Sequence, residues 1–235
     1  MNNYNKEEEY VPSYIEILSD DEEIPAKKRR KINHKGQNYN TIERANNSEK
    51  NSINEAFTQI VRERIYWNPN SHPYTALLLD SAILNTTNYL KDIGFSSENV
   101  LIPQCDKNDF NKMKGNHSSL FRGKLSEVIR IIKKVKFDTI WLDYCGSYRG
   151  NKSKQIHPYK DVNTIFNKRL LKNFSVLAVT CSYRCPSQNR MDYVTHINKC
   201  ANSNGYLLVK RFYIERYNKQ MTVVIFDVYR NLSKY

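Results

Sequence analysis

The chain has 235 residues, of which 40% are hydrophobic, enough for one ordinary domain with a real core and an additional tail. Its net charge is +13, yet residues 1–50 hold nine basic and ten acidic residues, so the rest of the chain carries +14. This excess predicts a polyanionic partner, most simply nucleic acid, against the alternative of a non-specific basic surface. No apolar run approaches the roughly 20 residues of a membrane span, and the polar, acidic N-terminus is unlike a signal peptide, so we expect no membrane association.

Cysteine usage gives a second indication of the setting. An odd number of cysteines without a secretory signal is typical of reduced thiols in an intracellular compartment. The closest pair, Cys181 and Cys185, has no second pair or histidine pair at a matching distance, so we expect no zinc site. The five cysteines are Cys105, Cys145, Cys181, Cys185 and Cys200.

Residues 1–50 are rich in Asn, Glu, Lys and Ser and poor in packing residues, which predicts a disordered tail. Within it, Ile15, Ile17 and Leu18 form a β-prone patch followed by an acidic block, residues 19–23. This pattern resembles a SUMO-interacting motif, in which the apolar residues add a strand to the partner's sheet edge. A charged, solvated tail is the alternative.

Five consecutive basic residues follow in the same tail. They resemble a monopartite nuclear localisation signal, and together with the preceding motif they favour a nuclear, eukaryotic setting. The five are Lys27, Lys28, Arg29, Arg30 and Lys31.

Residues 51–235 alternate between helical and strand patterns. A helix over 51–65 has an apolar stripe, and Ser52 and Glu55 are spaced as a capping box at its start. Further helices are predicted over 86–93, 108–114, 125–134, 161–171 and 191–202, and strands over 75–79, 99–103, 118–121, 138–142, 174–180, 206–213 and 222–229.

This alternation predicts an α/β fold: a Rossmann-like, doubly wound sheet of about seven strands, mostly parallel. The last two strands are joined by a short turn without a helix, so they must form an antiparallel hairpin. The strand over 138–142 is apolar, as expected of a strand buried on both faces, and it ends in Asp143, Tyr144, Cys145 and Gly146. In such sheets ligands bind beyond the carboxyl ends of the strands.

The order of elements over residues 55–230 resembles the class I S-adenosylmethionine-dependent methyltransferase fold. Leu77–Asp80 is similar to that family's first strand and its terminal acid, and Phe137–Asp143 to the fourth strand, whose acid begins the catalytic motif. Asp106 falls at the end of the second strand, where the family places an acid on the cofactor ribose. The resemblance implies S-adenosylmethionine as cofactor, held by Asp80, Ser81, Asn85, Thr86 and Asp106.

One segment departs from the family. Its first loop is rich in glycine so that the backbone can approach the cofactor, whereas residues 80–86 here, DSAILNT, contain no glycine. Two interpretations stay open. The cofactor site is rebuilt around Ser81, Asn85 and Thr86, or the cofactor no longer binds.

Two catalytic schemes fit the residues after the central strand. Asp143 would accept a hydrogen bond from an exocyclic amine while Tyr144 stacks on a flipped base, which resembles the motif of amino-methylating nucleic-acid enzymes without its prolines. Alternatively, a thiolate of Cys145 or Cys181 would attack a pyrimidine, since residues 179–182 are similar to the cysteine motif of RNA cytosine-5 methyltransferases. Simple packing of the tyrosine and the cysteines is the alternative to both.

A basic loop with interleaved tyrosines follows, and it suits a phosphate backbone and stacked bases. The sequence therefore predicts a nuclear methyltransferase acting on nucleic acid. A catalytically inactive scaffold that binds nucleic acid and SUMO-modified partners is the main alternative, and a protein-substrate methyltransferase is a further one. The predicted nucleic-acid contacts are Arg149, Lys152, Lys154, Lys160 and Arg184.

Overall fold

The computed structural model describes residues 48–68, 72–150, 156–182, 190–217 and 221–230, all of which lie in one compact unit that spans residues 40–235. The SUMO-interacting-like and nuclear-localisation-like motifs lie outside the described residues. None of the helices in the described part of the chain has the length and apolarity needed to cross a bilayer.

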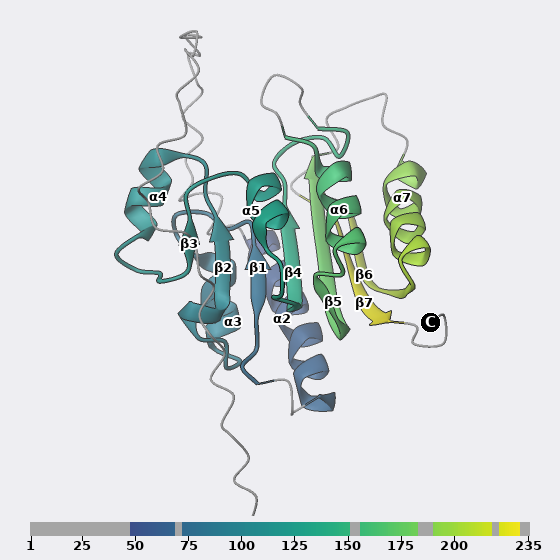
Figure 1. The fold of residues 1–235 in the computed structure, drawn as a ribbon, viewed down its shortest axis with the longest axis horizontal. Coiled ribbons are helices and arrows are strands. Elements are labelled where there is room, and N and C mark those ends of the chain that lie inside the picture. Colours follow the sequence, from purple (N-terminus) through teal and green to yellow (C-terminus); the bar gives the residue numbers. More distant parts are fainter. Residues whose placement is uncertain (1–47, 69–71, 151–155, 183–189, 218–220, 231–235) are drawn as a thin grey trace, which may run out of the picture. The chain divides into compact units, whose positions relative to one another are not determined.

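Seven strands form one sheet in the order β3-β2-β1-β4-β5-β7-β6 (Figure 1). All neighbours among the first five strands pair in parallel, and β7 runs antiparallel to both β5 and β6. The predicted fold class is therefore confirmed. The strands are β1 (Ala76–Leu78), β2 (Val100–Pro103), β3 (Leu120–Phe121), β4 (Phe137–Asp143), β5 (Leu171–Ser182), β6 (Tyr206–Tyr217) and β7 (Met221–Arg230).

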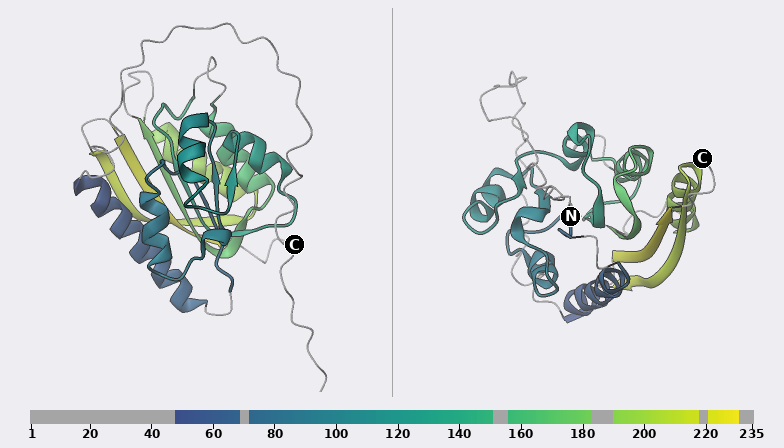
Figure 2. Two further views of the ribbon diagram at one scale, coloured as in Figure 1. Left: turned by 90° about the vertical axis from the view of Figure 1, so that its left-hand side faces the viewer. Right: turned by 60° about the horizontal axis from the view of Figure 1, so that its bottom comes forward.

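Helices cover both faces of the sheet, with α2 on one face and α5, α6 and α7 on the other (Figures 1 and 2). A short 3-10 helix, η2 (Ser97–Asn99), precedes β2. The helices are α2 (Ser48–Trp67), α3 (Asn85–Lys91), α4 (Lys107–Met113), α5 (Leu125–Ile131), α6 (Pro158–Asn167) and α7 (Arg190–Ser203).

Several elements have bounds that differ from the predicted ones, and two helices show the reasons. The first helix begins at Ser48 rather than at residue 51, and Ser52 donates a hydrogen bond to the Ser48 carbonyl within the helix instead of capping its start. The helix predicted over 161–171 spans Pro158–Asn167, because proline suits the first helical turn and Leu171 already pairs with Phe137 in the sheet.

The apolar stripe of α2 packs on the sheet as its periodicity predicts. Ile53, Phe57 and Val61 are buried in one cluster with residues of β1, β4, β5 and β7. The ring centroids of Phe57 and Trp141 lie 4.5 Å apart. Because this contact joins the first helix to the central strand, α2 is an integral layer of the domain.

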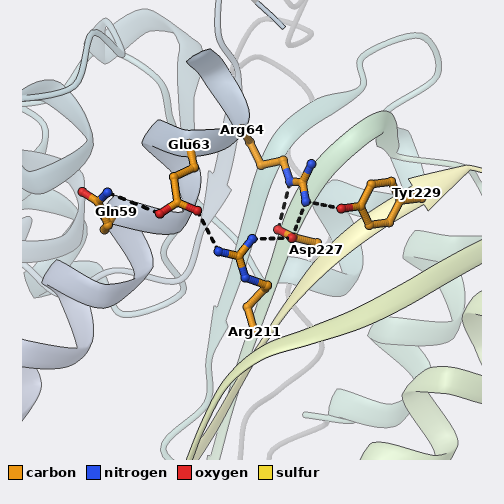
Figure 3. Close-up of polar contacts among 6 residues, drawn as sticks. All are labelled: Gln59, Glu63, Arg64, Arg211, Asp227 and Tyr229. Carbon is orange, nitrogen blue, oxygen red and sulfur yellow. Dashed lines mark hydrogen bonds and ion pairs between the residues drawn. The ribbon is translucent and has the colours of Figure 1, made fainter. Parts of the chain in front are cut away.

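Charged side chains hold the second half of α2 to the antiparallel strands (Figure 3). Asp227 of β7 is 1% exposed and accepts hydrogen bonds from both Arg64 of α2 and Arg211 of β6. Arg64 also donates to the Tyr229 hydroxyl, and Arg211 donates to Glu63 at 2.7 Å. The buried carboxylate thus has two cationic partners, which compensate the loss of its hydration.

Candidate functional site

Asp143 lies at the carboxyl end of β4, as predicted, and forms an ion pair with a residue that the sequence did not indicate. Lys50 Nζ, in the first turn of α2, lies 2.5 Å from Asp143 Oδ2. The same ammonium group lies 4.5 Å from the centroid of the Trp141 ring. The Asp143 side chain keeps 24% of its surface exposed, and Oδ1 accepts no hydrogen bond from the described residues. One carboxylate oxygen is thus available to a ligand.

A polar contact zone joins the first turns of α2 to α3. Asn85 Nδ2 donates to Asn51 Oδ1 at 3.3 Å, and Thr86 Oγ1 donates to Asn54 Oδ1 at 3.1 Å. Asn54 is fully buried, and its Nδ2 finds no hydrogen-bond partner among the described residues. A buried donor without an acceptor costs free energy, so this amide is suited to a polar ligand.

The loop between β1 and α3 forms its turn without glycine. Asp80 Oδ1 accepts from the Ser81 amide, and Oδ2 accepts from both the amide and the hydroxyl of Thr87, each at 2.8 Å. Burial raises the pKa of Asp80, while these hydrogen bonds and the charge of Lys50 oppose that rise. Asp80 therefore shapes the loop and the start of α3.

Leu84 supplies the left-handed backbone conformation in this loop, with φ 57° and ψ 34°. Its side chain is 5% exposed and belongs to the main core cluster. Non-glycine residues rarely adopt this conformation, so burial of the leucine side chain stabilises the turn.

Asp106 lies three residues beyond β2 and caps α4. Its Oδ1 accepts hydrogen bonds from the amides of Asn108 and Asp109, at 2.8 and 3.0 Å. The side chain is exposed at the same edge of the sheet, and Oδ2 accepts no hydrogen bond from the described residues. The carboxylate can therefore receive a ligand hydroxyl while it caps the helix.

Tyr144 and Cys181 are packed inside the domain. The Tyr144 hydroxyl donates to Asp161 Oδ2 at 2.7 Å, and burial together with Asp161 holds the pKa of Tyr144 well above its usual range. Burial likewise raises the pKa of the Cys181 thiol far above its usual range, which disfavours the thiolate that a nucleophile requires. Cys145 is exposed, so the two cysteines do not share one environment. The geometry favours Asp143 over either residue as the reacting group.

Two of the five predicted nucleic-acid contacts, Arg149 and Lys160, are exposed, and the other three lie outside the described residues. Beside Arg149, the Tyr148 hydroxyl lies 2.7 Å from His196 Nδ1 on α7. Burial raises the pKa of Tyr148, so the phenol stays protonated in this hydrogen bond. Arg149 is therefore presented from a fixed segment. The described residues contain no group of three or more side chains arranged to hold a metal ion.

The comparisons identify the fold. No family model and no curated protein matches the chain. Among solved structures, Trm1 from Pyrococcus horikoshii in complex with S-adenosyl-L-methionine superposes with a TM-score of 0.53 at 12% identity, over 77% of this chain and 56% of Trm1. TYW2 from M. jannaschii in complex with AdoMet has a TM-score of 0.45 at 15% identity, over 72% of this chain and 74% of TYW2. The chain thus spans little more than half the length of Trm1, and it has the class I methyltransferase fold.

Proposed function

We propose that this protein is an S-adenosylmethionine-dependent methyltransferase that acts on nucleic acid. One observation carries the proposal: a partly exposed carboxylate, Asp143, lies at the carboxyl end of β4 in a sheet of class I methyltransferase topology. Ligands of open α/β sheets bind at this edge. The basic excess of the chain supports a polyanionic substrate.

The residues at this edge fit the cofactor in their chemistry. The buried Asn54 amide without a partner offers a donor, and Asp106 Oδ2 offers an acceptor for a ribose hydroxyl. Ser81 on the β1–α3 loop and Asn85 at the start of α3 would bind the polar groups of the cofactor. When bound, S-adenosylmethionine supplies an activated methyl group for in-line transfer. Asp80 would hold the loop in place through its bonds to Thr87, and Thr86 would hold Asn54 in place through its hydroxyl.

The chain's own residues then orient the acceptor. Asp143 Oδ1 would accept a hydrogen bond from the N–H or O–H that receives the methyl group and would take up its proton. Arg149 and Lys160 would contact the phosphate backbone of the substrate. The proposed phosphate contacts also include three basic residues outside the described part of the chain, Lys152, Lys154 and Arg184.

A nuclear location and a SUMO-modified partner are further parts of the proposal, and they rest on residues of the tail. Deleting residues 27–31 should move a fluorescently tagged protein out of the nucleus. Replacing Ile15, Ile17 and Leu18 with alanine should abolish binding to SUMO without affecting localisation. Unchanged localisation after the deletion would contradict the nuclear assignment.

Calorimetric titration of the full chain with S-adenosylmethionine tests the function directly. We expect micromolar binding, and we expect Asp143→Asn to abolish methyl transfer to nucleic acid while the protein retains its fold by circular dichroism. Absence of binding by the folded protein would contradict the enzyme and favour the inactive scaffold. The absence of binding would then be explained by the β1–α3 loop, which has side chains, Leu84 among them, where a glycine-rich loop leaves room for the cofactor.

Substrate contact is expected to depend on the exposed basic residues. The double variant Arg149→Gln, Lys160→Gln should bind nucleic acid more weakly for all sequences, with a salt slope smaller by about two, because each residue contacts one phosphate. The variant Lys133→Gln, Lys134→Gln removes the same charge from exposed positions after α5 and serves as the control. An equal loss of nucleic-acid affinity in both variants would indicate that the overall positive charge, and not a defined contact surface, attracts the nucleic acid.

A further inference from the structure

We propose that Asp143 and Trp141 form a binding site for a compact organic cation, which the Lys50 ammonium group fills until the sulfonium of the cofactor replaces it. The inference deepens the proposed function and rests on it for the identity of the sulfonium ligand. A carboxylate beside the face of an indole ring is a combination that attracts organic cations through charge and through the ring quadrupole. Lys50 already contacts both groups, at 2.5 Å from Asp143 Oδ2 and 4.5 Å from the ring centroid.

The aromatic wall of this site is fixed before any ligand arrives. Trp141 Nε1 donates to Thr180 Oγ1 at 3.1 Å, which sets the plane of the ring. Phe57 packs against the ring at a centroid distance of 4.5 Å and an interplanar angle of 56°. Trp141 is 1% exposed, so a cation that leaves its face must be replaced by another group or by water. Preorganisation of this kind lowers the cost of binding.

The ion pair with Lys50 leaves part of the Asp143 carboxylate open. Lys50 Nζ contacts Oδ2, and 24% of the Asp143 side-chain surface stays exposed. Asp143 Oδ1 accepts no hydrogen bond from the described residues, so the acid retains an acceptor on the exposed side. A cation that reaches the site can therefore approach this carboxylate.

Lys50 occupies an unfavourable place in its own helix. It is the third residue of α2, where the positive end of the helix dipole repels cations. No other ion pair is formed by Lys50 within the described residues. Its position is therefore explained by the contacts with Asp143 and Trp141, and it would be free to leave once another cation takes them over.

The attachment of α2 allows such an exchange. Its second half is fixed to the sheet by Arg64 and Glu63, which pair with Asp227 and Arg211 (Figure 3). Ahead of the buried Ile53, the first turn is held by Lys50 and by the contact of Asn51 with Asn85, and the next turn also by the contact of Asn54 with Thr86. Withdrawal of Lys50 can therefore rearrange the first turn while the rest of the helix stays in place.

Titration of two ligands into two variants of the full chain tests the proposal. Lys50→Ala should bind S-adenosylmethionine about tenfold more tightly than the wild type, because the ligand no longer competes with an internal cation. Binding of S-adenosylhomocysteine, which lacks the sulfonium charge, should be unchanged. Arg62→Ala removes a cation from an exposed position on the same helix and should alter neither affinity. Weaker binding of S-adenosylmethionine to Lys50→Ala, or an equal gain for both ligands, would overturn the cation site.

A second probe separates this inference from the proposed function. Trimethylsulfonium, added at millimolar concentration, should shift the indole N–H resonance of Trp141 in Lys50→Ala but not in the wild type. The chain has two tryptophans, so Trp67→Phe assigns the signal. If neither variant binds S-adenosylmethionine but the shift occurs, the methyltransferase proposal fails and the cation site stands. If no shift occurs, the cation site is refuted even when the cofactor binds.

Discussion

Asp227→Ala is expected to lower the free energy of unfolding by about 3 kcal/mol, because it leaves two guanidinium groups without their shared buried counter-ion. Asp227 is 1% exposed and accepts from Arg64 Nε at 2.9 Å and from Arg211 Nη1 at 2.7 Å. Hydrogen bonds to Asp227 raise the pKa of both arginines. A guanidinium group stays protonated even without such a partner, so both arginines remain charged when the carboxylate is removed. Urea unfolding followed by circular dichroism measures the loss.

Glu63→Gln provides the matched control for this network. Glu63 pairs with Arg211 at 2.7 Å, but its side chain is 39% exposed, so the pair is screened by water. The substitution should lower the free energy of unfolding by less than about 1 kcal/mol.

Hydrogen exchange shows where in the fold the stability is lost. The exchange rate should increase along α2 in Asp227→Ala, because Arg64 links that helix to β7. A cost for Asp227→Ala no larger than that of Glu63→Gln would show that the network does not hold the helix.

The order of helices and strands followed from the sequence because hydrophobic periodicity is a local property. The continuous apolar run before Asp143 indicated a strand buried on both faces, and the short connection after Tyr213 required an antiparallel hairpin. The boundaries that failed depend on distant partners. Leu171 fits the end of a helix by pattern, yet it pairs with Phe137 of β4.

The candidate site was predictable only in part, for the same reason. Asp143 could be placed because strand ends mark the functional edge of an α/β sheet. Lys50 could not, because its partner is 93 residues away and the predicted helix began after it. The available signal for Lys50 was its place in the first turn of a helix. That position disfavours cations, so a lysine there indicates a specific anionic partner.

Side-chain direction limited the prediction for Cys181. Its position at the end of a strand was correct, but alternate residues of a strand point to opposite faces. Thr180 points to the Trp141 side, where it accepts the indole hydrogen bond, and so Cys181 points to the other face, where it is buried. Strand register, which the sequence leaves open by one residue, decides between a site residue and a core residue.

Asp161→Asn should stabilise the protein at pH 7.5 and have little effect at pH 4. Asp161 is 5% exposed, and burial raises its pKa from 3.8 to about 6, against the opposing hydrogen bond from Tyr144. Since the folded-state pKa is the higher one, the contribution of Asp161 to stability is fully present below about pH 4 and is lost as the pH rises through 6. Ionisation therefore costs the folded state about 3 kcal/mol at neutral pH.

Asparagine cannot ionise, and its carbonyl oxygen can still accept from the Tyr144 hydroxyl, so the variant should recover about 2 kcal/mol of that cost at pH 7.5. Chemical unfolding of both proteins between pH 4 and 8 measures the difference, with Asp92→Asn, the same substitution at an exposed position, as the control. A variant less stable than the wild type at pH 7.5 would mean that the carboxylate, not the carboxylic acid, is the form that the interior supports. In that case the contact of Tyr144 with a charged Asp161 would be what anchors the segment after Asp143.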